Sequence, residues 1–143
     1  MTRIDFYLDA GDRLQVACRL AAKALAQDRK VLVLAPDGDA AKAVDRMMWT
    51  TPPIGFVPHV MADHRLAGET PVVIARDADA MPHDDVLVNL GRDQPAGFAR
   101  FQRLIEIVGR DEDDKQAART RYRFYRDRGY EIHTHRLSGE GDG

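Results

Sequence analysis

The stretch VLVLA at residues 31–35 decides the fold of this chain. It is a continuous apolar run of strand length, and such runs are typical of strands covered on both faces, as in parallel sheets. Residues 3–8 (RIDFYL) alternate and are rich in β-forming residues, so they predict an earlier strand. Residues 13–27 predict a helix between the two, with a buried stripe of Leu14, Ala17, Cys18, Ala21 and Leu25. This strand–helix–strand order indicates an α/β layered fold.

The same pattern continues towards the C-terminus. Further strands are predicted at residues 55–59 (GFVPH), 71–75 (PVVIA), 85–90 (DVLVNL), 104–108 (LIEIV) and 130–136 (YEIHTHR), and further helices at 37–48, 96–100 and 115–128. We expect loops at residues 60–70 and 76–82. No repeat or long linker divides the chain, so we expect one domain over residues 1–137 and a disordered tail over residues 138–143.

Charge and cysteine content exclude several classes of protein. Of the 143 residues, 31% are charged and 44% hydrophobic, as in soluble globular domains. The net charge of −2 argues against a protein built to wrap nucleic acid. The single cysteine, Cys18, excludes an internal disulfide and a cysteine-based zinc cluster, and we interpret it as a core thiol. The N-terminus does not predict a signal peptide and no apolar run reaches membrane-spanning length, so we expect a cytoplasmic protein.

The sequence does not support a nucleotide site or an enzyme. The first strand–helix turn, residues 9–12 (DAGD), lacks both GxGxxG and GxxxxGK[ST], and its two aspartates would repel a phosphate. His133 and His135 share one strand face, a spacing compatible with metal binding, but without a third ligand we interpret them as a plain pair on an edge strand. The only serine, Ser138, lies in the tail. The carboxylates of residues 77 and 79, and of 84 and 85, could pair, but they flank predicted strands, where acidic residues are common. We therefore expect no catalytic residue, no cofactor and no metal.

The predicted helix over residues 115–128 carries most of the candidate binding residues. Asp113 and Asp114 precede it, where a helix N-terminus favours anions. One stripe of this helix contains Lys115, Arg119, Tyr122, Arg123 and Arg126, while Ala117, Ala118, Arg121, Phe124 and Tyr125 spread over the other sides. Cations beside an aromatic ring suit an acidic ligand with a hydrophobic anchor. The alternative is a solvated charged face, with Tyr122 half in the core.

Two large apolar residues, Trp49 and Phe56, lie in a connection rich in Pro and Gly. They either fill the core or form an exposed anchor pair for a protein partner. The residues alone do not decide between these alternatives.

Taken together, these motifs resemble the chi subunit of bacterial DNA polymerase III. The similarity runs from residues 6–8 (FYL) to His135, nearly the whole chain, and it depends on the order and spacing of several motifs. These are residues 29–34 (RKVLVL), Trp49 through 56–59 (FVPH), 85–90 through 98–101 (FARF) to 105–108 (IEIV), and 115–130 with its Lys115, Gln116, Arg119, Arg121, Tyr122, Tyr125, Arg126, Gly129 and Tyr130. Asp28 and Met48 depart from the residues that the family often has there.

The resemblance implies a fold, a function and two sets of site residues. The fold would be a three-layer α/β/α arrangement around a mostly parallel sheet, with a mononucleotide-binding-like topology but no nucleotide. The function would be that of a non-catalytic adaptor between the clamp loader and single-stranded-DNA-binding protein, whose acidic, phenylalanine-ended C-terminal tail it would bind. The implied tail-binding residues are Lys115, Gln116, Arg119, Tyr122 and Arg123, of which Arg123 replaces a lysine seen in some members.

The resemblance also implies a second partner. It would be the psi subunit of the clamp loader or, in some bacteria, an XPD/Rad3-like helicase. The implied contact residues are Trp49, Phe56, Val57, Pro58 and His59. The alternative hypothesis is a module that binds single-stranded nucleic acid directly through the basic helix, which the net charge argues against.

Overall fold

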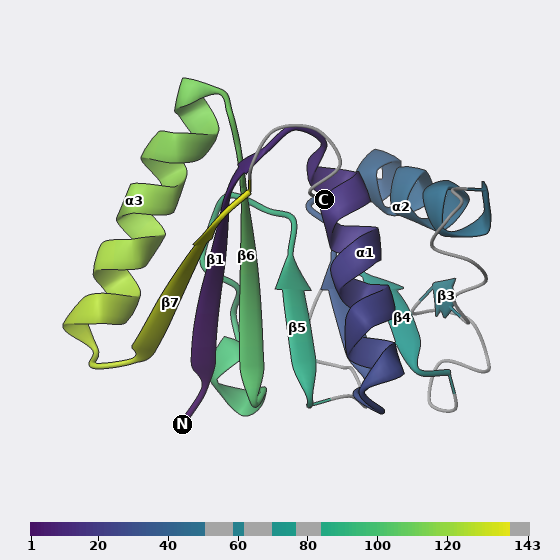
Figure 1. Ribbon diagram of the computed structural model, residues 1–143, viewed down its shortest axis with the longest axis horizontal. Helices are drawn as coiled ribbons and strands as arrows, with labels where there is room; N and C mark the ends of the chain where they lie inside the picture. Colours follow the sequence, from purple (N-terminus) through teal and green to yellow (C-terminus); the bar gives the residue numbers. More distant parts are fainter. Residues whose placement is uncertain (51–58, 62–69, 77–83, 138–143) are drawn as a thin grey trace.

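The computed structural model describes residues 1–50, 59–61, 70–76 and 84–137, and these form a three-layer α/β/α fold (Figure 1). Within this described part, the sheet has seven strands in the order β3-β4-β2-β5-β6-β1-β7, and every neighbouring pair is parallel. The strands are β1 (Arg3–Ala10), β2 (Val31–Leu34), β3 (His59–Met61), β4 (Val72–Ala75), β5 (Val86–Asn89), β6 (Arg103–Gly109) and β7 (Glu131–Arg136). The helices are α1 (Arg13–Ala26), α2 (Gly38–Thr50) and α3 (Glu112–Asp127), with a short 3-10 helix at Phe98–Arg100.

The two faces of the sheet carry different helices. α1 and α2 cover one face, and α3 with the 3-10 helix covers the other (Figure 1). Val31 and Val33 of β2 pack in the cluster under α1 and α2, whereas Leu32 packs in the cluster on the α3 side. The apolar run at residues 31–35 is therefore covered on both faces, and the predicted α/β/α fold is confirmed.

The N-terminal strand lies inside the sheet. β1 pairs with β6 on one side and with β7 on the other, so that Ile4 is opposite both Leu104 and Ile132. This arrangement brings the start of the chain beside two of its last three strands. The surroundings of β1 are therefore decided by strands about a hundred residues later.

Several element boundaries differ from the sequence prediction. β3 includes Val60 and Met61, so the loop predicted from residue 60 is wrong at its start; three residues are too few to show a period in the sequence. β1 runs on to Ala10, so the turn predicted at residues 9–12 begins later, and Asp12 instead caps α1 by accepting from the N–H groups of Leu14 and Gln15. α2 continues past residue 48 to Thr50. Predictions for residues 51–58, 62–69, 77–83 and 138–143, including the expected tail, lie outside the described residues.

A buried carboxylate ties the edge strand β7 to the strands beside it. Asp5 of β1 is fully buried; one oxygen lies 2.8 Å from Nε2 of His135 on β7, and the other accepts from Nε of Arg103 on β6 at 2.7 Å. Burial alone would raise the pKa of Asp5, but its hydrogen bonds with His135 and Arg103 and the Arg103 charge outweigh burial, and the pKa lies below its ordinary value.

We predict that Asp5→Asn lowers the free energy of unfolding at pH 7 by about 1–3 kcal/mol, as expected for lost hydrogen bonds to a charged group. A carboxyl whose folded pKa is depressed contributes stability above its unfolded pKa, about 3.9, and this contribution is lost as the pH falls through the folded pKa. The gap between wild type and variant should therefore narrow below about pH 4. Urea unfolding at several pH values measures this difference in the free energy of unfolding, and Asp93→Asn, at an exposed position, is the control. A difference that stays constant down to pH 3 contradicts the role of the Asp5 charge.

Candidate functional site

The start and end of α3 follow directly from its sequence. Its first turn carries Glu112, Asp113 and Asp114, whose charges are stabilised by the unpaired N–H groups and the dipole of the helix N-terminus. Helix-forming residues then continue without Pro or Gly to Asp127. Gly129 follows with a φ of 81°, a left-handed conformation that glycine adopts at little cost. The predicted helix is confirmed, and it begins three residues before the predicted start.

A buried polar network holds α3 on the sheet. Glu106 of β6 is fully buried, and its carboxylate forms an ion pair with Arg121 of α3, with Nε and Oε1 3.1 Å apart. The Tyr125 hydroxyl donates to the other oxygen of Glu106 at 2.6 Å, and the Asn89 amide of β5 donates to Oε1 at 2.9 Å. Arg121 also donates to the backbone carbonyl of Arg92 at 2.6 Å. The network therefore joins α3 to two strands and one loop.

The network's charges depend on one another because they lie away from water. Burial raises the pKa of the Glu106 carboxyl, although the Arg121 charge and the hydrogen bonds from Tyr125 and Asn89 oppose the increase. Burial and the neighbouring Glu106 also raise the pKa of Tyr125. The sequence prediction does not contain this network; the one local signal of it is a single acidic residue inside the apolar strand LIEIV.

We predict that Tyr125→Phe lowers the free energy of unfolding by about 1–3 kcal/mol, because it leaves an oxygen of the buried Glu106 without its donor. Chemical unfolding of both proteins measures the difference. Tyr122→Phe is the matched control, since Tyr122 lies on the same helix with 37% of its surface exposed. Equal losses in the two variants would contradict the importance of the Glu106 contact.

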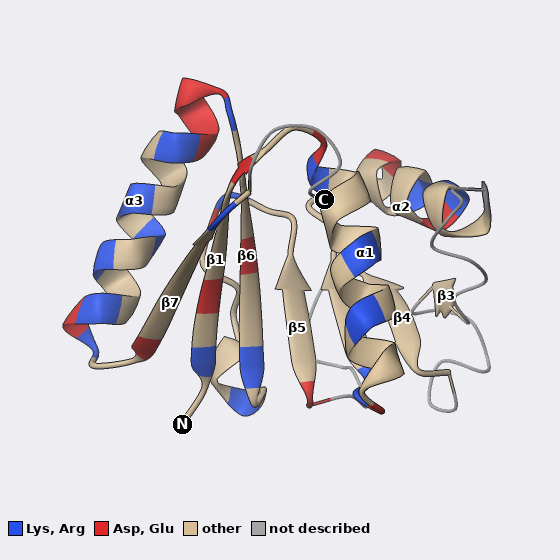
Figure 2. Cartoon of the chain, in the orientation of Figure 1, with Lys and Arg blue, Asp and Glu red and all other residues tan. Residues whose placement is uncertain are grey.

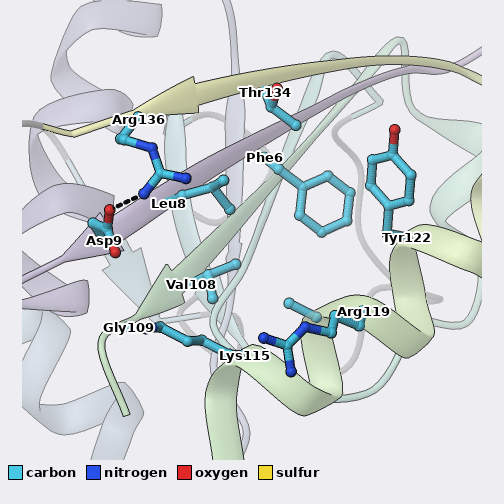
Figure 3. Close-up of a pocket in the computed structure, with 11 residues that line it drawn as sticks. Phe6, Leu8, Asp9, Val108, Gly109, Lys115, Arg119, Tyr122, Thr134 and Arg136 are labelled. Atoms are coloured by element: carbon cyan, nitrogen blue, oxygen red, sulfur yellow. Dashed lines mark hydrogen bonds and ion pairs between the residues drawn. The ribbon is translucent and has the colours of Figure 1, made fainter. Parts of the chain in front are cut away.

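An open groove of about 460 Å³ lies beside α3, between this helix and the three neighbouring strands β6, β1 and β7 at one end of the sheet (Figure 3). We call it the α3 groove. Its lining residues are Phe6, Leu8 and Asp9 of β1, Val108 and Gly109 of β6, Lys115, Ala118, Arg119 and Tyr122 of α3, and Thr134 and Arg136 of β7. Most of the floor is apolar, and the rings of Phe6 and Tyr122 lie 5.6 Å apart at a tilt of 55°.

Cations stand on both walls of the α3 groove. Lys115 and Arg119 rise from α3, and Arg136 stands on β7 opposite them (Figure 3). Figure 2 shows basic residues along the length of α3 and acidic residues at its start. An apolar floor between basic walls suits an acidic ligand that carries a hydrophobic group.

The structure brings together part of the predicted set on α3. Lys115, Arg119 and Tyr122 all line the α3 groove, whereas Gln116 and Arg123 are exposed outside its lining. Tyr122 is neither a core residue nor fully solvated, because one side of its ring packs on Phe6. The residues from β1, β6 and β7 had no local signal in the sequence, since only the strand order places them beside the helix.

The second predicted set is described in part. Trp49, at the end of α2, has 57% of its surface exposed, so it does not fill the core. Its ring lies 4.8 Å from that of His59, which is buried beneath it and whose Nε2 is 3.1 Å from Oδ1 of Asp45. Phe56, Val57 and Pro58 lie outside the described residues.

The two histidines of β7 have separate partners. His133 pairs with Glu131, and His135 contacts Asp5 and stacks on Tyr7 with ring centroids 4.5 Å apart. Among the described residues, no group of three or more His, Cys, Asp or Glu side chains is placed to hold a metal. No helix in this part of the chain is long and apolar enough to cross a membrane.

Comparison with known proteins identifies relatives along nearly the whole chain. The family model for "DNA polymerase III chi subunit, HolC" matches residues 1–133. The DNA polymerase III subunit chi of Pseudomonas aeruginosa is 38% identical over 141 residues, which cover 96% of this chain and 98% of that protein. The proteins of the same name from Escherichia coli K12 and Haemophilus influenzae are 33% and 30% identical, each over 84% of this chain and over 82% and 84% of their own lengths. The resemblance seen in the motifs is confirmed.

Proposed function

The chain belongs to the family of DNA polymerase III chi subunits, and on this premise we propose that it is a non-catalytic replication adaptor that binds single-stranded-DNA-binding protein. Its relatives are named as a subunit of DNA polymerase III, so its place is in DNA replication. The ligand in this proposal is the acidic C-terminal tail of the binding protein, which ends in phenylalanine. The site is the α3 groove.

The observation that carries the proposal is the combination of an apolar floor with basic walls. The terminal phenyl group would lie on the floor near Phe6 and Tyr122, whose rings are already 5.6 Å apart. The carboxylates of the tail would pair with Lys115 and Arg119 on the wall formed by α3. Arg119 is held near the groove by Glu112 at 3.3 Å, an exposed and therefore weak ion pair that a ligand can replace.

We predict that Arg119→Ala and Tyr122→Ala each weaken binding of the tail by about 1–3 kcal/mol, as for a charge-assisted contact or a packed aromatic anchor. Titration with a synthetic peptide that copies the tail from the same organism measures this effect. A peptide without the final phenylalanine should not bind, and added salt should weaken the complete peptide.

The matched control for these variants is Arg126→Ala. Arg126 is exposed on the same helix, outside the lining of the α3 groove, and pairs with the adjacent Asp127. Arg126→Ala changes the net charge by the same amount as Arg119→Ala. If Arg119→Ala and Arg126→Ala weaken binding equally, the helix acts through general charge and not through the groove.

Direct binding of single-stranded DNA is the alternative use of the same helix. Gel shifts with bare single strands distinguish it from tail binding, because a direct binder forms a tight, strongly salt-dependent complex without any partner protein. We expect no such complex, since acidic residues interrupt the basic surface of α3 at its first turn and the net charge is −2.

We propose a second contact at Trp49, with the psi subunit of the clamp loader or an XPD/Rad3-like helicase as partner. The supporting observation is a tryptophan with 57% of its surface exposed, packed at 4.8 Å on the ring of the buried His59. A tryptophan supported from below in this way is a typical anchor in protein interfaces.

We predict that Trp49→Ala weakens binding of this partner by about ten-fold or more and leaves binding of the tail peptide unchanged. Arg119→Ala should weaken binding of the tail peptide and leave binding of this partner unchanged, so each variant is the control for the other. Co-purification with the psi subunit or helicase of the same organism, beside the peptide titration, measures both effects. Retention of the partner by Trp49→Ala at wild-type strength would place the contact elsewhere.

A further inference from the structure

The wall of the α3 groove opposite α3 carries its own ion pair, between Asp9 of β1 and Arg136 of β7 (Figure 3). We propose that Arg136 binds a carboxylate of the acidic peptide. In the free protein the carboxylate of Asp9 pairs with Arg136 and so takes the place of the peptide carboxylate. This inference rests on the proposed function of the groove. It extends the ligand site from the helix to the edge of the sheet.

A backbone irregularity places Asp9 in the groove. Alternate residues of a strand share a face, and Phe6 and Leu8 both line the α3 groove, so a regular strand would turn Asp9 to the other face. The register between β1 and β6 shifts between Tyr7 and Ala10, and Asp9 has a φ of 65°. As a result Asp9 lines the groove directly after Leu8, and Ala10 packs in the cluster under α1 and α2.

The left-handed conformation of Asp9 is held by its neighbours. Non-glycine residues seldom adopt a positive φ, although aspartate and asparagine do so more readily than most. Arg110 donates to the Asp9 carbonyl at 3.3 Å, and Arg136 pairs with the Asp9 carboxylate. The bulge therefore places the Asp9 carboxylate within reach of Arg136 on the neighbouring strand β7.

The pairing of β1 with β7 places Arg136 beside this bulge. Leu8 is opposite Arg136 in the register, and the backbone N–H of Leu137 donates to the Leu8 carbonyl at 2.9 Å. The side chain of Arg136 is 70% exposed and that of Asp9 is 29% exposed. An ion pair in contact with water contributes little stability, so a second carboxylate can take the place of Asp9.

The charges of the groove favour an acidic peptide between its two walls. Lys115 and Arg119 stand on one wall and Arg136 on the other, and Asp9 is the one acidic residue among the described residues that line the groove. An acidic tail offers several carboxylates, so cations on both walls can be paired at once. Asp9 competes with the ligand for one of these cations and sets part of the affinity.

The experiment compares variants of the full chain in titrations with the synthetic tail peptide at one ionic strength. Asp9→Asn removes the charge and keeps a residue that tolerates a positive φ, and Asp9→Gly removes the side chain at a φ that glycine also accepts. Arg136→Ala removes the cation, and Asp9→Asn combined with Arg136→Ala tests whether the two residues act together. Thermal unfolding of each variant checks that it folds.

We expect Asp9→Asn and Asp9→Gly to bind the peptide roughly two- to five-fold more tightly than wild type, the range of an exposed ion pair. Arg136→Ala should bind it more weakly by a similar factor, and the double variant should match Arg136→Ala. If wild type binds the peptide but both Asp9 variants bind as wild type does, the inference is wrong and the proposed function stands. If wild type does not bind the peptide, the proposed function and the inference are both wrong.

Discussion

The contact between Glu106 and Arg121 is the interaction on which the candidate site depends. It joins the central part of β6 to α3 at a position where both side chains are buried, so each charge depends on the other. Because removal from water costs buried ions much of what they gain from pairing, such a contact contributes little net stability. Its main effect is on orientation: only one rotation of α3 brings Arg121 to Glu106 and, one turn later, the Tyr125 hydroxyl to the same carboxylate.

This rotation of α3 decides which side chains face the groove. With Ala118, Arg121 and Tyr125 turned towards the sheet, the neighbouring stripe of Lys115, Arg119 and Tyr122 lies along the opening. Residues of α3 that lie beyond this stripe, on the side away from the sheet, point into solvent. A buried polar network and an exposed basic wall are thus two sides of one helix, and a change in the first would displace the second without touching it.

Local patterns allowed the layers of the fold and one wall of the groove to be predicted. The apolar run at residues 31–35 indicated a parallel sheet, and the period of residues 115–128 placed Lys115, Arg119 and Tyr122 together. The opposite wall could not be predicted, because Asp9 and Arg136 are 127 residues apart and only the strand order brings them into contact. The left-handed conformation of Asp9 could not be predicted either, because its sequence, DAGD, is typical of a simple turn.

The position of β1 between β6 and β7 has a consequence for how the groove comes into existence. The first strand of the chain finds its two neighbours only among residues 103–109 and 131–136, so these contacts close very long loops. Non-local pairing of this kind slows folding, and during synthesis β1 stays without its neighbours until most of the chain has been made. All four elements that line the groove must be in place before it exists. During synthesis the groove therefore cannot form before β7 has been made, and a ligand that fits it would bind only molecules that already contain β7.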